Sequence, residues 1–144
     1  MRLTSYSDYS LRLLMYAALK GDGLVTIQEV SDAYGISRNH LMKVALDLGR
    51  NGFLETVRGR NGGMRLARKP GEIGLGAVLR TTEEDFNTVE CFNTRSNTCV
   101  ISGHCRLKGA LARALKAYFE VLDEYTLADL TDKHPALARL LVPA

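Results

Sequence analysis

Residues 26–66 have the sequence TIQEVSDAYGISRNHLMKVALDLGRNGFLETVRGRNGGMRL, which decides the fold. Thr26 and Glu29 have the spacing of a capping box, in which each side chain satisfies a free backbone donor at the start of a helix. Gly35 permits a tight turn, and Ser37 is a suitable N-cap for the next helix. Two short helices joined by a turn that contains glycine form a helix-turn-helix.

A hairpin is predicted directly after the second of these helices. Residues 53–57 (FLETV) and 64–66 (MRL) have strand character, and the glycine-rich residues 58–63 lie between them. A hairpin at this place after a recognition helix is a wing. The sequence therefore predicts a winged helix-turn-helix.

Three further helices are predicted outside this unit, the shortest of them near Leu75 to Arg80. Residues 5–20 have apolar side chains at helical spacing, and glycines follow at positions 21 and 23. A long helix is expected from about Cys105 to Leu130, with an apolar stripe at Leu107, Leu111, Leu115, Tyr118, Leu122 and Tyr125. We expect this stripe to pack against a second subunit. The predicted class is mainly α with a small β wing, a winged helix-turn-helix plus a long C-terminal dimerisation helix.

This reading divides the chain into three parts. Residues 1–70 are the DNA-binding winged helix, residues 71–104 are a connector and a loop, and residues 105–144 are the dimerisation helix and tail. Residues 83–104 show neither helical nor strand periodicity. A loop of this length is uncommon unless it has a function or something orders it.

Composition excludes several classes of protein. The chain has 144 residues, of which 46% are hydrophobic and 24% charged, and it has no apolar run long enough to span a membrane. The N-terminus lacks the apolar segment of a secretory signal, so we expect a cytoplasmic protein. A phosphate loop and a serine–histidine constellation are both missing, so we do not expect an enzyme.

Basic residues are concentrated in the predicted DNA-binding part. The net charge is only +3, yet positions 36–70 hold eight basic residues (Arg38, Lys43, Arg50, Arg58, Arg60, Arg65, Arg68 and Lys69) and two acidic ones (Asp47 and Glu55). Such segregation is typical of a polyanion partner. The candidate DNA contacts are Arg38, Asn39, His40 and Lys43 on the recognition helix, and Arg58, Arg60 and Arg65 on the wing. The alternative is a winged helix used for protein contacts.

Three cysteines lie in or beside the unpatterned loop, at Cys91, Cys99 and Cys105. An odd number of clustered thiols argues against a disulfide framework and favours a soft metal. Seven and five residues separate them, which leaves an iron–sulfur cluster, zinc and free thiols all open. A cuboidal cluster takes a fourth ligand, for which the candidates are His104, Glu90, Asp85 and Asp8. Asp8 can equally help to cap the first helix.

Several motifs resemble a known family, the winged-helix iron–sulfur regulators that include IscR, RirA and the NsrR-type nitric-oxide-sensing repressors. They are MRLT at residues 1–4, YSDY at 6–9, SRNHL at 37–41, VRGRNGG at 57–63, VECF at 89–92, CVI at 99–101 and YTLADL at 125–130. Asp8, the Arg38-Asn39-His40 sequence and the last of these segments are most similar to NsrR. Lys108 stands where IscR-type proteins have a ligating histidine.

The resemblance implies a homodimer that binds double-stranded operator DNA and holds one 4Fe–4S cluster per subunit. Cys91, Cys99 and Cys105 would bind the cluster, with Asp8 of the partner subunit as fourth ligand. The expected function is a repressor that senses nitric oxide and then loses DNA affinity. An iron- or cluster-status regulator of the same family is the first alternative, and a zinc-stabilised interaction module is the second.

Overall fold

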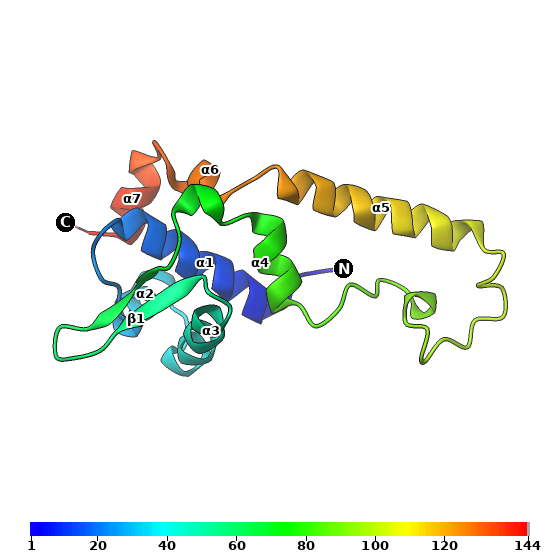
Figure 1. The fold of residues 1–144 in the computed structure, drawn as a ribbon, viewed down its shortest axis with the longest axis horizontal. Coiled ribbons are helices and arrows are strands. Elements are labelled where there is room, and N and C mark those ends of the chain that lie inside the picture. Colours follow the sequence, from blue (N-terminus) through cyan, green and yellow to red (C-terminus); the bar gives the residue numbers. More distant parts are fainter. Residues whose placement is uncertain (144) are drawn as a thin grey trace.

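A helical body and a projecting arm make up the molecule, and the computed structural model describes residues 1–143 of it (Figure 1). The body surrounds α1 (Ser5–Lys20), and the arm is α5 (Arg106–Asp123). The prediction of a mainly helical chain with one small hairpin is confirmed. Among residues 1–143, no helix has both the length and the apolar character needed to cross a membrane.

The helix α1 is the centre of the body. Leu13 and Leu14 are fully buried, and Tyr16 and Ala17 are nearly so. The helix begins at an N-cap, Thr4, whose hydroxyl accepts a hydrogen bond from the backbone N–H of Ser7. The N-cap residue is thus Thr4 and not Asp8, whereas Asp8 lies in the first turn, where its charge faces the positive end of the helix as expected.

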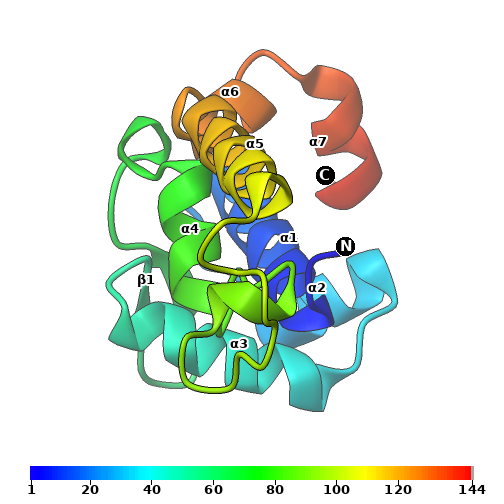
Figure 2. The ribbon, with the colours of Figure 1, turned by 90° about the vertical axis from the view of Figure 1, so that its right-hand side faces the viewer.

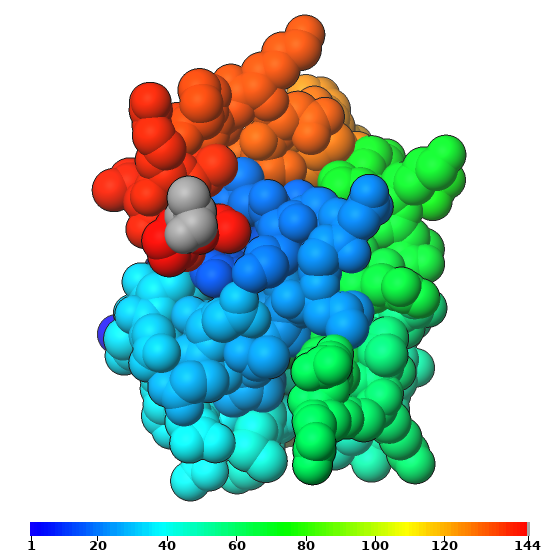
Figure 3. Space-filling model, turned by 90° about the vertical axis from the view of Figure 1, so that its left-hand side faces the viewer, coloured from blue at the N-terminus to red at the C-terminus, as the bar shows by residue number. Residues whose placement is uncertain are grey.

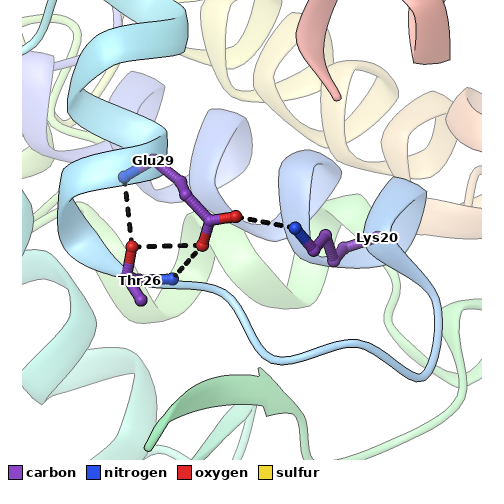
Figure 4. Close-up of polar contacts among 3 residues, drawn as sticks. All are labelled: Lys20, Thr26 and Glu29. Atoms are coloured by element: carbon purple, nitrogen blue, oxygen red, sulfur yellow. Dashed lines mark hydrogen bonds and ion pairs between the residues drawn. The ribbon is translucent and has the colours of Figure 1, made fainter. Parts of the chain in front are cut away.

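The helix-turn-helix has the predicted form, with α2 (Ile27–Tyr34) and α3 (Arg38–Arg50) joined at Gly35. Thr26 and Glu29 form the predicted capping box, and Lys20 at the end of α1 pairs with the same carboxylate at 2.6 Å (Figure 4). Gly35 has φ 67°, a conformation that glycine adopts without strain. Ser37 is the N-cap residue of α3, although its side chain makes no capping hydrogen bond.

The wing is an antiparallel hairpin of β1 (Leu54–Val57) and β2 (Gly63–Leu66), with Glu55 opposite Arg65. Its base is joined to the body by two 2.8 Å backbone hydrogen bonds between Val25 and Met64. Glycine is required at position 62, since a Cβ there would overlap the carbonyl oxygen of Val57.

A connector and a long irregular loop follow the wing. The connector contains a short 3-10 turn, η1 (Pro70–Glu72), and leads into α4 (Leu75–Thr82), close to where the sequence predicts a short helix. Residues 83–105 have one regular element, the 3-10 turn η2 (Glu90–Phe92). The expectation of an irregular segment here is confirmed.

The expectation of one helix from Cys105 to Leu130 is wrong. The arm α5 ends at Asp123, and a separate short helix, α6 (Leu127–Thr131), begins after its own capping box of Thr126 and Asp129. The break allows strand-like hydrogen bonds with the start of α4. Leu75 N–H donates to Tyr125 O at 3.0 Å, and Leu127 N–H donates to Ile73 O at 2.8 Å. A continuous helix could not make these bonds, because its own i→i−4 hydrogen bonds would engage both the carbonyl of Tyr125 and the N–H of Leu127.

The C-terminal elements return to the body. Leu127 of α6 is fully buried beside α1, and Leu141 and Val142 at the end of α7 (Pro135–Leu141) pack against the same core. Figure 3 shows these orange and red segments resting on the blue surface of α1. The three C-terminal helices therefore have different roles: α5 extends away from the body, whereas α6 and α7 complete the core of the body.

The contact between Lys20 and Glu29 gives a test of the body's stability. Burial raises the pKa of Glu29, but the hydrogen bonds from Lys20 and Thr26 outweigh it, and the pKa lies below its ordinary value of 4.5. Because the folded-state pKa is depressed, this contribution to stability is present above about pH 4.5 and is lost as the pH falls further. Glu29→Gln keeps the cap but removes the charge.

We expect Glu29→Gln to lower the free energy of unfolding at pH 7 by about 0.5 kcal/mol, the scale of a partly exposed ion pair. Urea titrations at pH 7 and pH 3 measure the difference, which should shrink at the lower pH. Glu120→Gln is the control, because Glu120 meets Lys116 only in an exposed pair at 3.6 Å. An equal loss at both pH values would show that the charge is not responsible.

Candidate functional site

One face of α3 is buried and the opposite face is free. The side chains of Leu41, Val44 and Leu48 are 1% exposed or less. With a rotation of about 100° per residue, the outward face centres on Asn39, Lys43 and Leu46. Figure 2 shows α3 along the edge of the body opposite α6 and α7. This edge presents the helix to a partner as a recognition helix requires.

The four residues predicted to contact DNA from this helix are all exposed. Asn39 and Lys43 lie on the outward face, whereas Arg38 and His40 lie on its two flanks. The His40 ring is 6.1 Å from the ring of Tyr9 on α1, so it also contacts the core helix.

The wing carries the remaining predicted contacts. Arg58 and Arg60 are exposed around Gly59, whose φ of 120° turns the chain at the tip of the hairpin. Arg65 is different, because its guanidinium forms an ion pair with Glu55 on the opposite strand. Its charge is therefore partly neutralised within the wing, which leaves Arg58 and Arg60 as the unopposed charges of this hairpin's turn.

Two exposed residues on α3 are not among those that we predicted. Met42 and Leu46 are 55% and 56% exposed, unusual values for large apolar side chains. A helical projection of residues 38–50 would have found them, because they lie away from Leu41, Val44 and Leu48. The sequence argument selected only charged and polar residues and so missed them.

The start of α1 is joined to the end of α4 by buried and half-buried polar contacts. The hydroxyls of Ser7 and Thr82 lie 2.7 Å apart and are buried. Glu83 accepts hydrogen bonds from the N–H and hydroxyl of Thr4, at 2.8 and 2.9 Å. Burial alone would raise the pKa of Glu83, but its hydrogen bonds lower it below the ordinary value. The loop that contains the cysteines thus begins at a fixed point on α1.

A second contact connects α1 to the recognition helix. The Tyr6 hydroxyl donates to Asp47 on α3 at 2.5 Å. Burial, and then the hydrogen bond to this carboxylate, raise the pKa of Tyr6, so the phenol keeps its proton and remains a donor. The first turn of α1 therefore contacts both α4 and α3.

The three cysteines are free thiols on the segment between α4 and α5. Cys91 is buried in η2 and lines a groove of about 750 Å³ that runs beside α5, while Cys99 and Cys105 are half-buried. Cys105 is the N-cap of α5, and its sulfur accepts a hydrogen bond from Lys108 N–H at 3.4 Å. The backbone of Cys99 makes two hydrogen bonds of 3.0 Å: its N–H donates to the side-chain oxygen of Asn97, and its carbonyl accepts from the hydroxyl of Ser102.

The oxygen and nitrogen candidates for a fourth ligand lie in different settings. Glu90 accepts hydrogen bonds from the hydroxyl and the backbone N–H of Thr98, which lower its pKa. These bonds connect two parts of the loop that are eight residues apart. Asp85 accepts from Asn87 N–H at 2.8 Å, and His104 is exposed. Asp8 pairs with Arg12 at 2.9 Å, with 45% of its side chain exposed.

These groups are not gathered around one point. Within residues 1–143, no set of three or more His, Cys, Asp or Glu side chains is arranged to hold a metal ion. The chain therefore brings its thiols onto one loop but does not bring Asp8 to them. Three reduced thiols of this kind suit a soft metal or a cluster by their chemistry.

Comparisons with known proteins identify the family of this chain. The Rrf2 profile, described as "Iron-dependent Transcriptional regulator", matches residues 3–133. The chain is 51% identical to the HTH-type transcriptional regulator NsrR of Bacillus licheniformis, with 98% of this chain and 99% of that protein covered. It is 53% identical to the NsrR protein of Halalkalibacterium halodurans, with 98% and 97% covered.

A solved structure of T. potens IscR has the same fold, with a TM-score of 0.73, 25% identity, and 90% of this chain and 85% of that one covered. The relatives are transcriptional regulators and not enzymes, as predicted. The resemblance inferred from the wing and cysteine motifs is confirmed, and the chain belongs to the Rrf2 family of transcriptional regulators.

Proposed function

We propose that this protein is a dimeric repressor that senses nitric oxide through a 4Fe–4S cluster and loses DNA affinity in response. The observation that carries the proposal is the position of the three thiols. They lie on a loop that begins at Glu83, which is hydrogen-bonded to Thr4 at the start of the core helix α1. The relatives named NsrR support the nature of the signal.

Cys91, Cys99 and Cys105 would hold the cluster. Their thiolates are the donors that iron–sulfur clusters take, and no sulfur is engaged in a disulfide. When bound, the cluster supplies iron that reacts with nitric oxide. The chain's part is to tie both ends of the loop to α4 and α5, so that holding three thiolates together fixes the path of residues 91–105.

Asp8 of the partner subunit is the proposed fourth ligand. Within one chain Asp8 lies on α1, away from any group of cysteines, and its carboxylate is half exposed. A second subunit could therefore reach it. This arrangement would couple the loop of one subunit to the core helix of the other, and so would set the spacing of the two recognition helices.

The arm α5 is the proposed dimer contact. None of its residues is buried, and Leu107 and Val121 are 65% and 53% exposed. These two residues share one face of the helix with Leu111 and Tyr118. An apolar stripe of this length is stable in water when a partner covers it.

The proposed DNA contacts are the exposed residues of α3 and the wing. Asn39 and Lys43 face outward for the major groove, with Arg38 and His40 at the flanks, and Arg58 and Arg60 reach a neighbouring groove from the hairpin turn. Arg65 is the weakest member of this set because Glu55 competes for its guanidinium.

An iron-dependent regulator is the second candidate function. The family is described as one of iron-dependent transcriptional regulators, which supports this candidate. Both functions would use the same thiols, so they differ in the signal and not in the site.

The ligand set can be tested by substitution. Cys91→Ala, Cys99→Ala and Cys105→Ala should each abolish the visible absorption and bound iron of protein purified without oxygen. Asp8→Ala should keep the three thiols but give a cluster that is lost faster on exposure to nitric oxide, followed by stopped-flow absorbance. Ser96→Ala is the loop control, because Ser96 is exposed and was never a ligand candidate, and it should behave like the unchanged protein. An Asp8→Ala protein with the original spectrum and response would exclude Asp8 as a ligand.

The dimer contact predicts a change of oligomeric state. Leu111→Glu and Val121→Glu place charges on the apolar stripe, so we expect monomers in sedimentation velocity experiments at micromolar concentration. Arg113→Glu changes the charge of the same helix on another face and should leave the dimer intact. Dimers that persist in both stripe variants would place the contact elsewhere.

A further inference from the structure

The outward face of α3 has an apolar strip that the fold does not use. Met42 and Leu46 are one helical turn apart and are 55% and 56% exposed. The core beneath α3 is already filled by Leu41, Val44 and Leu48. Because Met42 and Leu46 are neighbours, they form one apolar patch, and a patch that is rimmed by polar residues is the arrangement that marks an interaction site.

The surroundings of the strip identify the chemistry of that partner. Asn39 and Lys43 lie on the same face of the helix, and Arg58 and Arg60 extend from the neighbouring wing. Positions 36–70 carry eight basic residues against two acidic ones. A second copy of this surface would meet like charges, whereas a polyanion would be attracted to it.

We infer that Met42 and Leu46 read thymine bases by contact with their C5-methyl groups in the major groove. The inference rests on the proposed DNA binding and adds a sequence preference to it. The thymine methyl is the apolar group that a base pair presents in this groove, and an apolar side chain is its matching partner. Asparagine pairs with the N6 and N7 atoms of adenine, so Asn39 beside Met42 favours A·T pairs under the N-terminal half of α3.

This reading separates two kinds of contact on one helix. Lys43 and the wing arginines attract phosphates of any sequence, and they supply most of the salt-dependent affinity. Met42 and Leu46 are uncharged, so they do not contribute to the attraction of phosphates, but they distinguish thymine from the other bases. Their removal should therefore change sequence preference more than salt dependence.

The test uses the full-length dimer, purified without oxygen, and a library of random DNA duplexes. The best duplex is selected, and each thymine in it is then replaced by uracil, which lacks only the methyl group. We expect affinity to fall about fourfold at one or more positions, the scale for burial of a single methyl group. Met42→Ala should remove this difference at one position and Leu46→Ala at another, whereas Met42→Leu should keep it.

Leu140→Ala is the matched control, because Leu140 is 80% exposed on α7, on the other side of the body. Its affinity for thymine and uracil duplexes should be that of the unchanged protein. If the library yields no preferred duplex, the proposed sequence-specific DNA binding fails, and this inference fails with it. If a duplex is selected but uracil binds as well as thymine at every position, DNA binding stands and the inference is wrong. Self-association that Met42→Ala abolishes would likewise overturn it, in favour of a contact between copies.

Discussion

The buried hydrogen bond between the hydroxyls of Ser7 and Thr82 is the constraint around which the molecule is organised. It joins the first turn of α1 to the last turn of α4, and Thr4 with Glu83 extends the same junction by two more hydrogen bonds. Because α1 also packs against α3 and α6, the junction fixes where the cysteine loop leaves the winged helix. Two buried hydroxyls that satisfy each other also avoid the cost of an unpaired polar group in the core.

The same turn of α1 contacts the recognition helix through Tyr6 and Asp47. The first turn of α1 therefore contacts both α3 and the point at Glu83 where the cysteine loop, residues 83–105, begins. A change in the loop therefore needs no large rearrangement of the body to reach the DNA-facing edge. The proposed response to nitric oxide depends on this short connection, and on the arm α5 that would hold two such bodies in register.

The sequence contains most of this fold but not all of it. Thr26 and Glu29 could be recognised because glycines flank their helix. The related cap at Thr126 and Asp129 lies within an apolar stripe that continues past it, and so it was missed. The stripe alone predicted one helix, and only the bonds from residues 125 and 127 to the start of α4 show why it breaks. For the site, residue type indicated Asn39 and the cysteines. The pairing of Arg65 with Glu55 depends on the register of the two strands, which residue type does not reveal, whereas a helical projection of α3 would have found the exposure of Met42.

The decisive experiment titrates the anaerobically purified protein with nitric oxide, and it records the absorbance of the cluster and the binding of a selected DNA duplex in the same sample. The account predicts that DNA affinity falls by roughly tenfold or more, within the usual range of coupling between two sites, in step with the loss of absorbance. A protein that loses its absorbance completely and still binds the same DNA with unchanged affinity would show that the loop and the recognition helix are not coupled.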